Sequence, residues 1–315
     1  MSKPSIAFAT IGPLVALAVA CAFFATQSDR FLTGQNFSLI LQQVMVVGVI
    51  AIGQTLVILT AGIDLSCGMI MALGSIIITK FSVEYGVNPY LAILCGLVAC
   101  AAFGLVNGAL ITFIKLPPFI VTLGTLNIAF ATTQLYSHAQ TLTGLPDALL
   151  FFGDIVRLGG TAVTYGTLLM LILYGITWFV LRETAIGRHM YAVGNSPEAA
   201  RLMGINTRRL LILVYTVAGV IYGVAGLLLV ARTGVGDPNA GQTDNLDSIT
   251  AVVLGGTSLF GGRGMIFGTL VGAVIVGVIR NGLTLTGVSS VYQILITGVL
   301  VIVAVATDQM SRRKS

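Results

Sequence analysis

Amide and carboxylate side chains interrupt several long apolar stretches of this 315-residue chain. These residues are Gln42, Gln43, Gln54, Asp64, Asn107, Asn127 and Asn281. Amides donate and accept hydrogen bonds, so they can replace the water that a neutral, hydroxyl-rich solute loses when it leaves solution. A substrate path is therefore one interpretation, and its candidates are Gln43, Gln54, Asp64, Asn107 and Asn127. The other is structural, because such side chains hold membrane helices together and Asp64 can cap a helix that begins near Leu65.

The usual signatures of an enzyme are missing from the sequence. It contains no GxxxxGK[ST] segment for nucleotide phosphates and no GxSxG nucleophile motif. The two histidines, His138 and His189, fall in predicted loops on opposite faces, so they are not expected to share a metal or nucleophile site. All four cysteines lie in apolar segments without CxxC spacing, as is typical of packing residues. We expect no catalytic residue, no metal site and no cofactor on this chain.

The composition places these residues in a membrane. Hydrophobic residues make up 56% of the chain and charged residues 9%, against roughly 25% charged residues in an ordinary soluble domain. The mean hydropathy of +1.00 excludes a soluble globule. A net charge of +5 would suggest nucleic acid as the partner of a soluble protein. Here we attribute the charge to membrane topology, and we expect contact with the lipid bilayer and none with nucleic acid.

Ten apolar stretches have about the length of a membrane span. They cover residues 6–26, 39–60, 65–80, 91–114, 119–137, 163–182, 210–231, 246–260, 265–282 and 291–307. We predict an all-α fold, a polytopic membrane helical bundle of about ten transmembrane helices, in which residues 1–315 form a single domain. Glycine and polar residues at 62–68 and 255–264 predict short, re-entrant or discontinuous helices there. Residues 39–137 and 210–307 each hold four spans, which suggests a four-helix internal repeat.

Lysine and arginine are distributed unequally between the two sets of loops. With a cytoplasmic N-terminus, eleven of the sixteen lie inside, as the positive-inside rule requires. These eleven are Lys3, Lys115, Arg182, Arg188, Arg201, Arg208, Arg209, Arg263, Arg312, Arg313 and Lys314. The run after Lys3 is longer than a signal peptide core, so we interpret it as a retained span and expect both termini in the cytoplasm. The Gly-rich loop 234–246, with Asp237, Asp244 and Asp247, is expected on an acidic outer surface.

The longest basic loop, residues 183–209, contains helix start and stop signals. Ser196 is a good N-cap, Pro197 suits the first helical position and Glu198 favours the positive end of a helix. Gly204 can adopt the left-handed conformation that follows a last turn. We predict a helix over residues 197–203, ~10 Å long and too short to span a bilayer. It is either a docking helix for a partner's groove or an ordinary connector that lies on the membrane.

Four segments of the chain together resemble one family of transport proteins. They are GRHMYAVGNSPEAARLMGIN (187–206), ILTAGIDLSCG (58–68), KLPPFIVTLGTL (115–126) and AVVLGGTSLFGGRG (251–264). In their order and spacing they resemble bacterial ABC sugar-import permeases of the ribose, xylose and fructose type, over about residues 30–310. The stretch 39–66 and the closing VAVATDQ resemble the fructose-type members most.

The resemblance implies a set of partners and a coupling site. It implies a permease subunit in the bacterial inner membrane that pairs with a second permease copy, cytoplasmic ABC ATPase subunits and a periplasmic sugar-binding protein. ATP and magnesium would bind to the ATPase subunits, so this chain needs no cofactor. The helix in loop 183–209 would sit in a cleft of the ATPase. The positions carried over for this ATPase coupling are Gly187, Arg188, Ser196, Pro197, Glu198, Ala199, Arg201 and Gly204.

Three other functions compete with a monosaccharide importer. One is an ABC permease for another small solute, such as a branched-chain amino acid or a nucleoside. Another is a secondary transporter driven by an ion gradient, but such carriers usually need buried ionisable residues, and most charges of this chain fall in predicted loops. The last is a membrane-embedded enzyme or scaffold, which the missing catalytic constellation disfavours.

Overall fold

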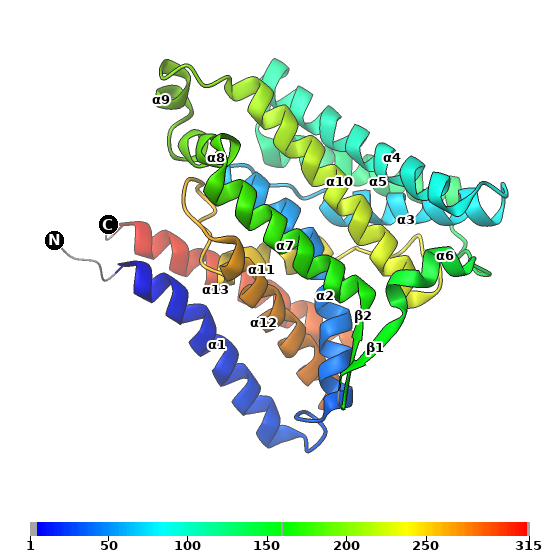
Figure 1. Cartoon of the computed structure of the whole chain (residues 1–315). Coiled ribbons are helices and arrows are strands. Elements are labelled where there is room, and N and C mark those ends of the chain that lie inside the picture. The colour runs from blue at the N-terminus through cyan, green and yellow to red at the C-terminus, as the bar shows by residue number, and fades with distance from the viewer. Residues whose placement is uncertain (1–4, 159, 314–315) are drawn as a thin grey trace.

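The computed structural model describes residues 5–158 and 160–313, and this part of the chain is almost entirely helical (Figure 1). Its longer helices are α1 (Ser5–Gln27), α2 (Gly34–Leu59), α3 (Cys67–Val83), α4 (Pro89–Ala109), α5 (Pro118–Ser137), α7 (Tyr165–Glu183), α10 (Thr207–Thr233), α12 (Ile266–Leu285) and α13 (Ser290–Arg313). The short ones are η1 (Leu110–Ile114), α6 (Asp147–Leu150), η2 (Phe151–Gly153), α8 (Ala185–Asn195), α9 (Pro197–Leu202) and α11 (Asp244–Leu254). Strands β1 (Ile155–Leu158) and β2 (Thr161–Thr164) form one antiparallel hairpin. The predicted helical membrane bundle is confirmed.

The predicted spans differ from the structure mainly in length. Within the described residues, seven helices are long and apolar enough to cross a membrane. Helix α11 replaces the predicted span 246–260, but it has only 11 residues. At 1.5 Å per residue it is about 16 Å long, half of a hydrocarbon core about 30 Å thick. This expectation was wrong because the apolar run continues into a glycine-rich connector, which does not stay helical.

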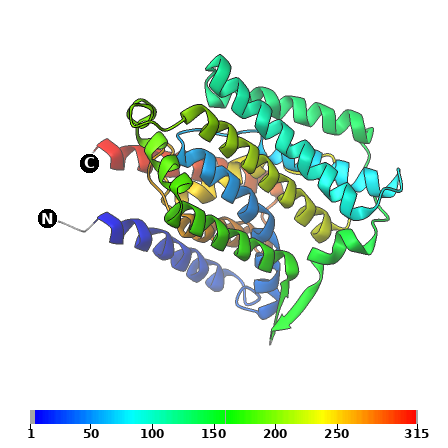
Figure 2. The same ribbon diagram turned by 45° about the horizontal axis from the view of Figure 1, so that its top comes forward.

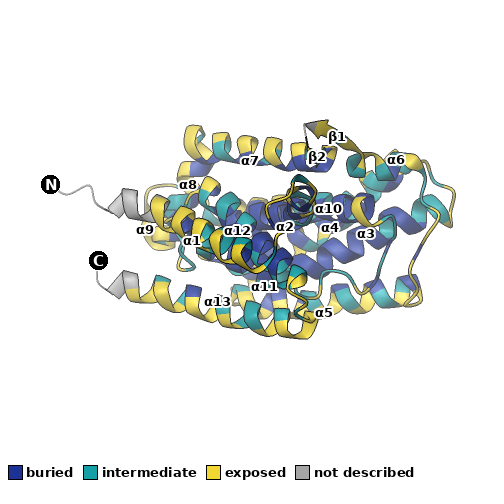
Figure 3. Ribbon diagram, turned by 90° about the horizontal axis from the view of Figure 1, so that it is seen from below, coloured by how far each residue is buried: buried dark blue, intermediate teal, exposed yellow. Residues whose placement is uncertain are grey.

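Helix α2 forms the centre of the bundle. It is buried on almost every side from Ile40 to Leu59, as a helix that is apolar all round should be (Figure 3). Small residues let the neighbouring helices approach closely: a β-carbon on Gly104 of α4 would overlap the carbonyl oxygen of Tyr215 in α10. Helix α12 packs in the same way, with Gly272 against the Ala251 carbonyl of α11.

Two interruptions of the helices lie where glycine and polar residues predicted them. The chain leaves α2 through Ala61, which has a left-handed φ of 61°, and runs without helix to Cys67. The second interruption joins α11 to α12, and its Gly256, Gly261 and Gly262 also have positive φ. The first interruption follows α2, which is the first helix of the half 39–137. The second interruption follows α11, which is the second helix of the half 210–307. The breaks therefore do not match between the two halves, and the repeat stays a prediction.

The segment before α11 corrects the expectation of a surface loop over residues 234–246. Gly236 pairs with Leu142 where both residues are buried, and Gly241 lies against Gly68 at the start of α3. Asp244 is the first residue of α11, and Asp247 is fully buried. Because α11 is too short to start at the membrane surface, the chain descends into the bundle before the helix begins. Two of the three expected surface aspartates are thus inside the protein.

The start of α1 and the end of α13 lie at the same end of the bundle as α8 and α9 (Figures 1 and 2). The β1–β2 hairpin and α6 lie at the opposite end. This arrangement agrees with an even number of crossings. Lys3 and Lys314, two of the basic residues used for the orientation, lie outside the described residues.

Candidate functional site

The basic loop folds into two consecutive helices. Thr184 caps α8, since its side chain accepts a hydrogen bond from the Gly187 backbone N–H at 3.3 Å. Ser196 caps α9 in the same way, accepting from the Ala199 N–H at 3.3 Å. Pro197 occupies the first turn and Glu198 is its acidic residue, as the sequence predicted.

Helix α9 ends in a Schellman motif that depends on Gly204. The Ile205 N–H donates to the Ala200 carbonyl at 3.1 Å, and the Gly204 N–H donates to the Arg201 carbonyl at 3.0 Å. Gly204 has a φ of +87°, a conformation that residues with a β-carbon rarely adopt. The helix therefore stops one residue earlier than the predicted range 197–203 and turns back towards α10.

Helix α9 is exposed on nearly all sides. Its predicted coupling residues Pro197, Glu198, Ala199, Arg201 and the following Gly204 are exposed, and within α9 only Ala200 is buried. Leu202 and Met203 leave 90% and 71% of their surfaces open. Two large apolar side chains at the tip of a projecting helix form a small surface suited to a partner protein.

The two coupling residues on α8 have different environments. Gly187 is buried, and a β-carbon there would overlap the carbonyl oxygens of Val180 and Leu181 at the end of α7. Arg188 is exposed, and its guanidinium donates to the Glu183 carbonyl at 3.5 Å. Gly187 thus fixes the angle between α7 and α8, whereas Arg188 is free to meet another molecule.

The inner side of α8 joins both helix interruptions. Gly194 packs on the Leu59 carbonyl at the end of α2, and the Gly262 N–H donates to that same carbonyl at 3.0 Å. The Tyr191 hydroxyl donates to the Gly264 carbonyl at 3.0 Å. Burial raises the pKa of Tyr191, so the phenol stays a neutral donor. We call the contact of Leu59, Gly194 and Gly262 the glycine junction.

A chain of buried polar groups holds the first interruption. Asp64 accepts from the Ser66 backbone N–H at 2.8 Å and from the Ser66 hydroxyl. The Asn107 amide of α4 donates to the Ser66 oxygen at 3.1 Å, and Thr125 of α5 donates to the Asn107 carbonyl oxygen at 2.8 Å. The structure therefore brings Asp64 and Asn107 together through Ser66, ahead of α3.

Of the other predicted path residues, Gln43 and Asn127 do not join this network, and Gln54 reaches it only through Tyr222, whose side chain also contacts Asp64. Gln54 is buried and accepts from the Tyr222 hydroxyl at 3.4 Å, while its amide nitrogen has no partner among the described residues. Asn127 is exposed on α5 and donates to the Leu123 carbonyl of its own helix at 2.9 Å. Gln43 lies about 16 Å along α2 from Gln54, at 1.5 Å per residue. The five candidates do not form one continuous site.

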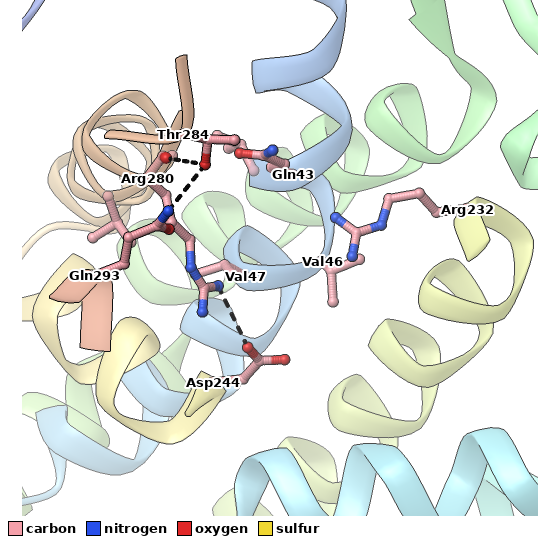
Figure 4. A pocket seen from close by; sticks show the side chains of 11 residues that line it. Gln43, Val46, Val47, Arg232, Asp244, Arg280, Thr284 and Gln293 are labelled. Atoms are coloured by element: carbon pink, nitrogen blue, oxygen red, sulfur yellow. Dashed lines mark hydrogen bonds and ion pairs between the residues drawn. The ribbon is translucent and has the colours of Figure 1, made fainter. Parts of the chain in front are cut away.

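Gln43 instead lines a charged cavity of about 250 Å³ that the sequence analysis did not identify (Figure 4). Arg232, Asp244 and Arg280 also line it. Arg280 lies in an apolar helix and forms an ion pair with Asp247 at 2.8 Å. A charge inside an apolar helix was a usable signal, because intramembrane ionisable residues usually have a function. The signal was missed because Arg280 lies two residues before the end of the predicted span 265–282 and was counted among the charges of the outer side.

Comparison with known proteins gives a consistent match along almost the whole chain. Residues 36–305 match the family described as branched-chain amino acid transport system, permease component. The chain is 48% identical to the fructose import permease protein FrcC of Rhizobium meliloti, over 96% of this chain and 85% of that protein. It is 41% identical to the ribose import permease protein RbsC of Bacillus subtilis, over 97% and 93% of the two chains.

A more distant relative is the galactose/methyl galactoside import permease protein MglC of Salmonella typhimurium, at 34% identity over 95% of this chain and 94% of that protein. No solved structure gives a significant match. The similarity therefore extends over the full membrane bundle, including α8, α9 and both interruptions.

Proposed function

The chain belongs to the family of branched-chain amino acid transport system permease components, and on that premise we propose that it imports a monosaccharide of the fructose, ribose or xylose class. The observation that supports this most is the 48% identity to a fructose import permease along 96% of the chain. In this proposal the chain is the membrane-spanning subunit of an ABC importer in the bacterial inner membrane. It binds neither ATP nor magnesium itself.

The projecting helix α9 supports the proposed coupling to cytoplasmic ATPase subunits. Glu198 and Arg201 offer charges, and Leu202 and Met203 offer an apolar tip that is open to solvent. Helix α9 is about 9 Å long, which suits a cleft on a partner's surface. The glycine junction places α8, the helix that directly precedes α9, in backbone contact with the end of α2, so movement of the ATPase would reach the core of the bundle through α8.

Two further partners complete the proposal. A second copy of the chain would supply a second α9, so that a symmetric pair of ATPase subunits meets a symmetric pair of docking helices. A periplasmic sugar-binding protein would deliver the substrate at the end that carries the β1–β2 hairpin. Both termini would lie in the cytoplasm with α8 and α9. Of the path residues, Gln43 and Gln54 have unpartnered polar atoms that a hydroxyl-rich solute could use.

Sugar uptake by living cells tests the proposed function. We would delete the gene from the bacterium that encodes it and measure uptake of labelled fructose, ribose, xylose and leucine. Loss of uptake of one sugar, restored by the wild-type gene, would support the proposal. Loss of leucine uptake alone would instead assign the chain to amino acid import, the activity that the family description names. Uptake that requires an ion gradient and does not require ATP would favour a secondary transporter.

A further inference from the structure

The charged cavity lies at the end of the bundle opposite the docking helix. Five helices line it: α2, α10, α11, α12 and α13 (Figure 4). Helix α10 ends at Thr233, α12 ends at Leu285 and α13 begins at Ser290, so the cavity lies close to the ends of three helices. These are the ends nearest the hairpin, whereas α8 and α9 lie at the other end. The cavity is thus close to the side from which a delivered solute would enter.

Part of the polar lining is held firmly by the protein. Arg280 pairs with Asp247 at 2.8 Å and donates to the Thr243 hydroxyl at 3.1 Å. The Thr284 hydroxyl donates to the Arg280 carbonyl at 2.8 Å and accepts from the Gln293 amide at 3.2 Å. These contacts fix the side chains before any ligand arrives, which lowers the entropic cost of binding.

Two other polar groups in the cavity have no strong partner. The Gln43 side-chain oxygen is buried and accepts no hydrogen bond within the described part of the chain. Arg232 makes only a long hydrogen bond of 3.4 Å to the Gln42 carbonyl, and no carboxylate of the described residues lies within 4.0 Å of it. One unused acceptor and one unused donor therefore face the same space. A hydroxyl group, which donates and accepts, can satisfy both.

The formal charge and the volume of the cavity indicate which class of ligand fits it. Arg232 and Arg280 balance Asp244 and Asp247, so the formal charge of the site is zero and a neutral ligand fits better than an anion. Val47 and Val276 form an apolar wall. A volume of about 250 Å³ corresponds to about eight water molecules at about 30 Å³ each. That space suits a single sugar ring, with hydroxyls towards the charged groups and C–H groups towards the valines.

We propose that this cavity is a weak monosaccharide site on the permease itself, which receives the sugar before it crosses the bundle. This inference rests on the proposed function. The affinity is expected in the millimolar range, because a transport site must release its ligand as readily as it takes it up. Gln43 and Arg232 are the residues that contact the sugar, and Asp247 positions Arg280.

Protection of a cysteine in the cavity tests the site. Thr284→Cys is placed in a full-length chain whose Cys21 and Cys95 are alanine, purified into nanodiscs without partner proteins. The rate of reaction with a charged thiol reagent is measured with D-fructose, D-ribose, D-xylose or an equal concentration of leucine. At least one sugar should slow the reaction twofold or more, and leucine should not. No protection by any sugar, or equal protection by leucine, would overturn the site.

Two glutamines that are adjacent in sequence provide matched variants. Gln43→Leu should raise the sugar concentration for half-maximal protection about 2- to 10-fold, the value of one hydrogen bond. Gln42→Leu, on the same helix but outside the cavity lining, should leave it unchanged. Equal shifts for both variants would contradict the site. Unprotected Thr284→Cys together with normal sugar uptake by wild-type cells would refute this inference and leave the proposed function standing.

Discussion

Gly194 at the end of α8 lies against the carbonyl oxygen of Leu59 at the end of α2, so closely that a β-carbon at position 194 would overlap that oxygen. The same carbonyl accepts the Gly262 N–H at 3.0 Å. One carbonyl group therefore connects the segment that carries the docking helix with both interruptions of the membrane helices. A displacement of α8 cannot leave these interruptions unchanged, because backbone atoms, not flexible side chains, form the contact.

Gly194→Ala should separate α8 from α2 and destabilise the protein by about 1–3 kcal/mol, the usual cost of overpacking. Gly175→Ala in α7 is the matched control, since nothing lies within 4 Å of the added methyl group. It should be neutral or slightly stabilising, because alanine favours a helix over glycine. Thermal unfolding in detergent measures both. Equal melting temperatures for the two variants would mean that the glycine junction is not a tight contact.

Substitutions of Arg280 and Asp247 should have strongly non-additive effects on the free energy of unfolding, because the two residues form an ion pair. Asp247 is 1% exposed and Arg280 is 35% exposed, so Arg280→Gln should cost about 3 kcal/mol, near the lower end for a buried pair that loses one partner. The double variant Arg280→Gln with Asp247→Asn should recover part of that loss, because Asp247 no longer carries an unpaired charge, while Asp244 still loses the ion pair that it makes with Arg280 at 3.8 Å. Additive losses in a double-mutant cycle of unfolding free energies would show that the pair does not matter.

The orientation of the chain can be tested with single introduced cysteines. Leu202→Cys on α9 and Ser311→Cys near the C-terminus should be protected from an impermeant thiol reagent in intact cells and react after lysis. Gln140→Cys, exposed in the loop after α5, should react from outside. Labelling of residue 202 or 311 in intact cells would show that the proposed topology is wrong.

Docking of the ATPase should depend on the turn at Gly204. Gly204→Val and Gly287→Val carry the same backbone strain, because both glycines end a helix in a Schellman motif, with φ values of +87° and +77°. Only Gly204 lies beside α9. Capture of the ATPase by the tagged chain should therefore fall at least tenfold for Gly204→Val and stay normal for Gly287→Val. A similar loss for both would mean that strain, not docking, explains the defect.

Capping and turn residues predicted those parts of the fold that depend only on neighbouring residues. The Ser196 cap, the Pro197 start and the Gly204 stop each act within a few residues, so α9 could be placed from the sequence. The ends of α11 could not, because its length depends on the packing of Gly241 on Gly68 and of Gly272 on Ala251. These contacts join residues far apart in the sequence, and composition does not report them.

The candidate sites divide in the same way. The coupling helix could be predicted because its signals are contiguous. The charged cavity could not, because Gln43, Arg232 and Arg280 come from three helices whose rotation about their axes the sequence does not give. Asn127 shows the opposite case: its amide is polar within an apolar run, as Asn107 is, but it faces outwards. A polar residue within an apolar run is therefore a candidate for a buried site, but the sequence does not show which of these residues contact one another.

ATP-driven uptake of a sugar into proteoliposomes is the decisive test of the proposed import function. The vesicles would contain this chain with the proposed partner ATPase, and the proposed sugar-binding protein would be added outside. A labelled monosaccharide should accumulate only when ATP is enclosed, and Gly204→Val should abolish both uptake and sugar-stimulated ATP hydrolysis. Accumulation without ATP, driven by an ion gradient and unaffected by Gly204→Val, would contradict the proposed import function.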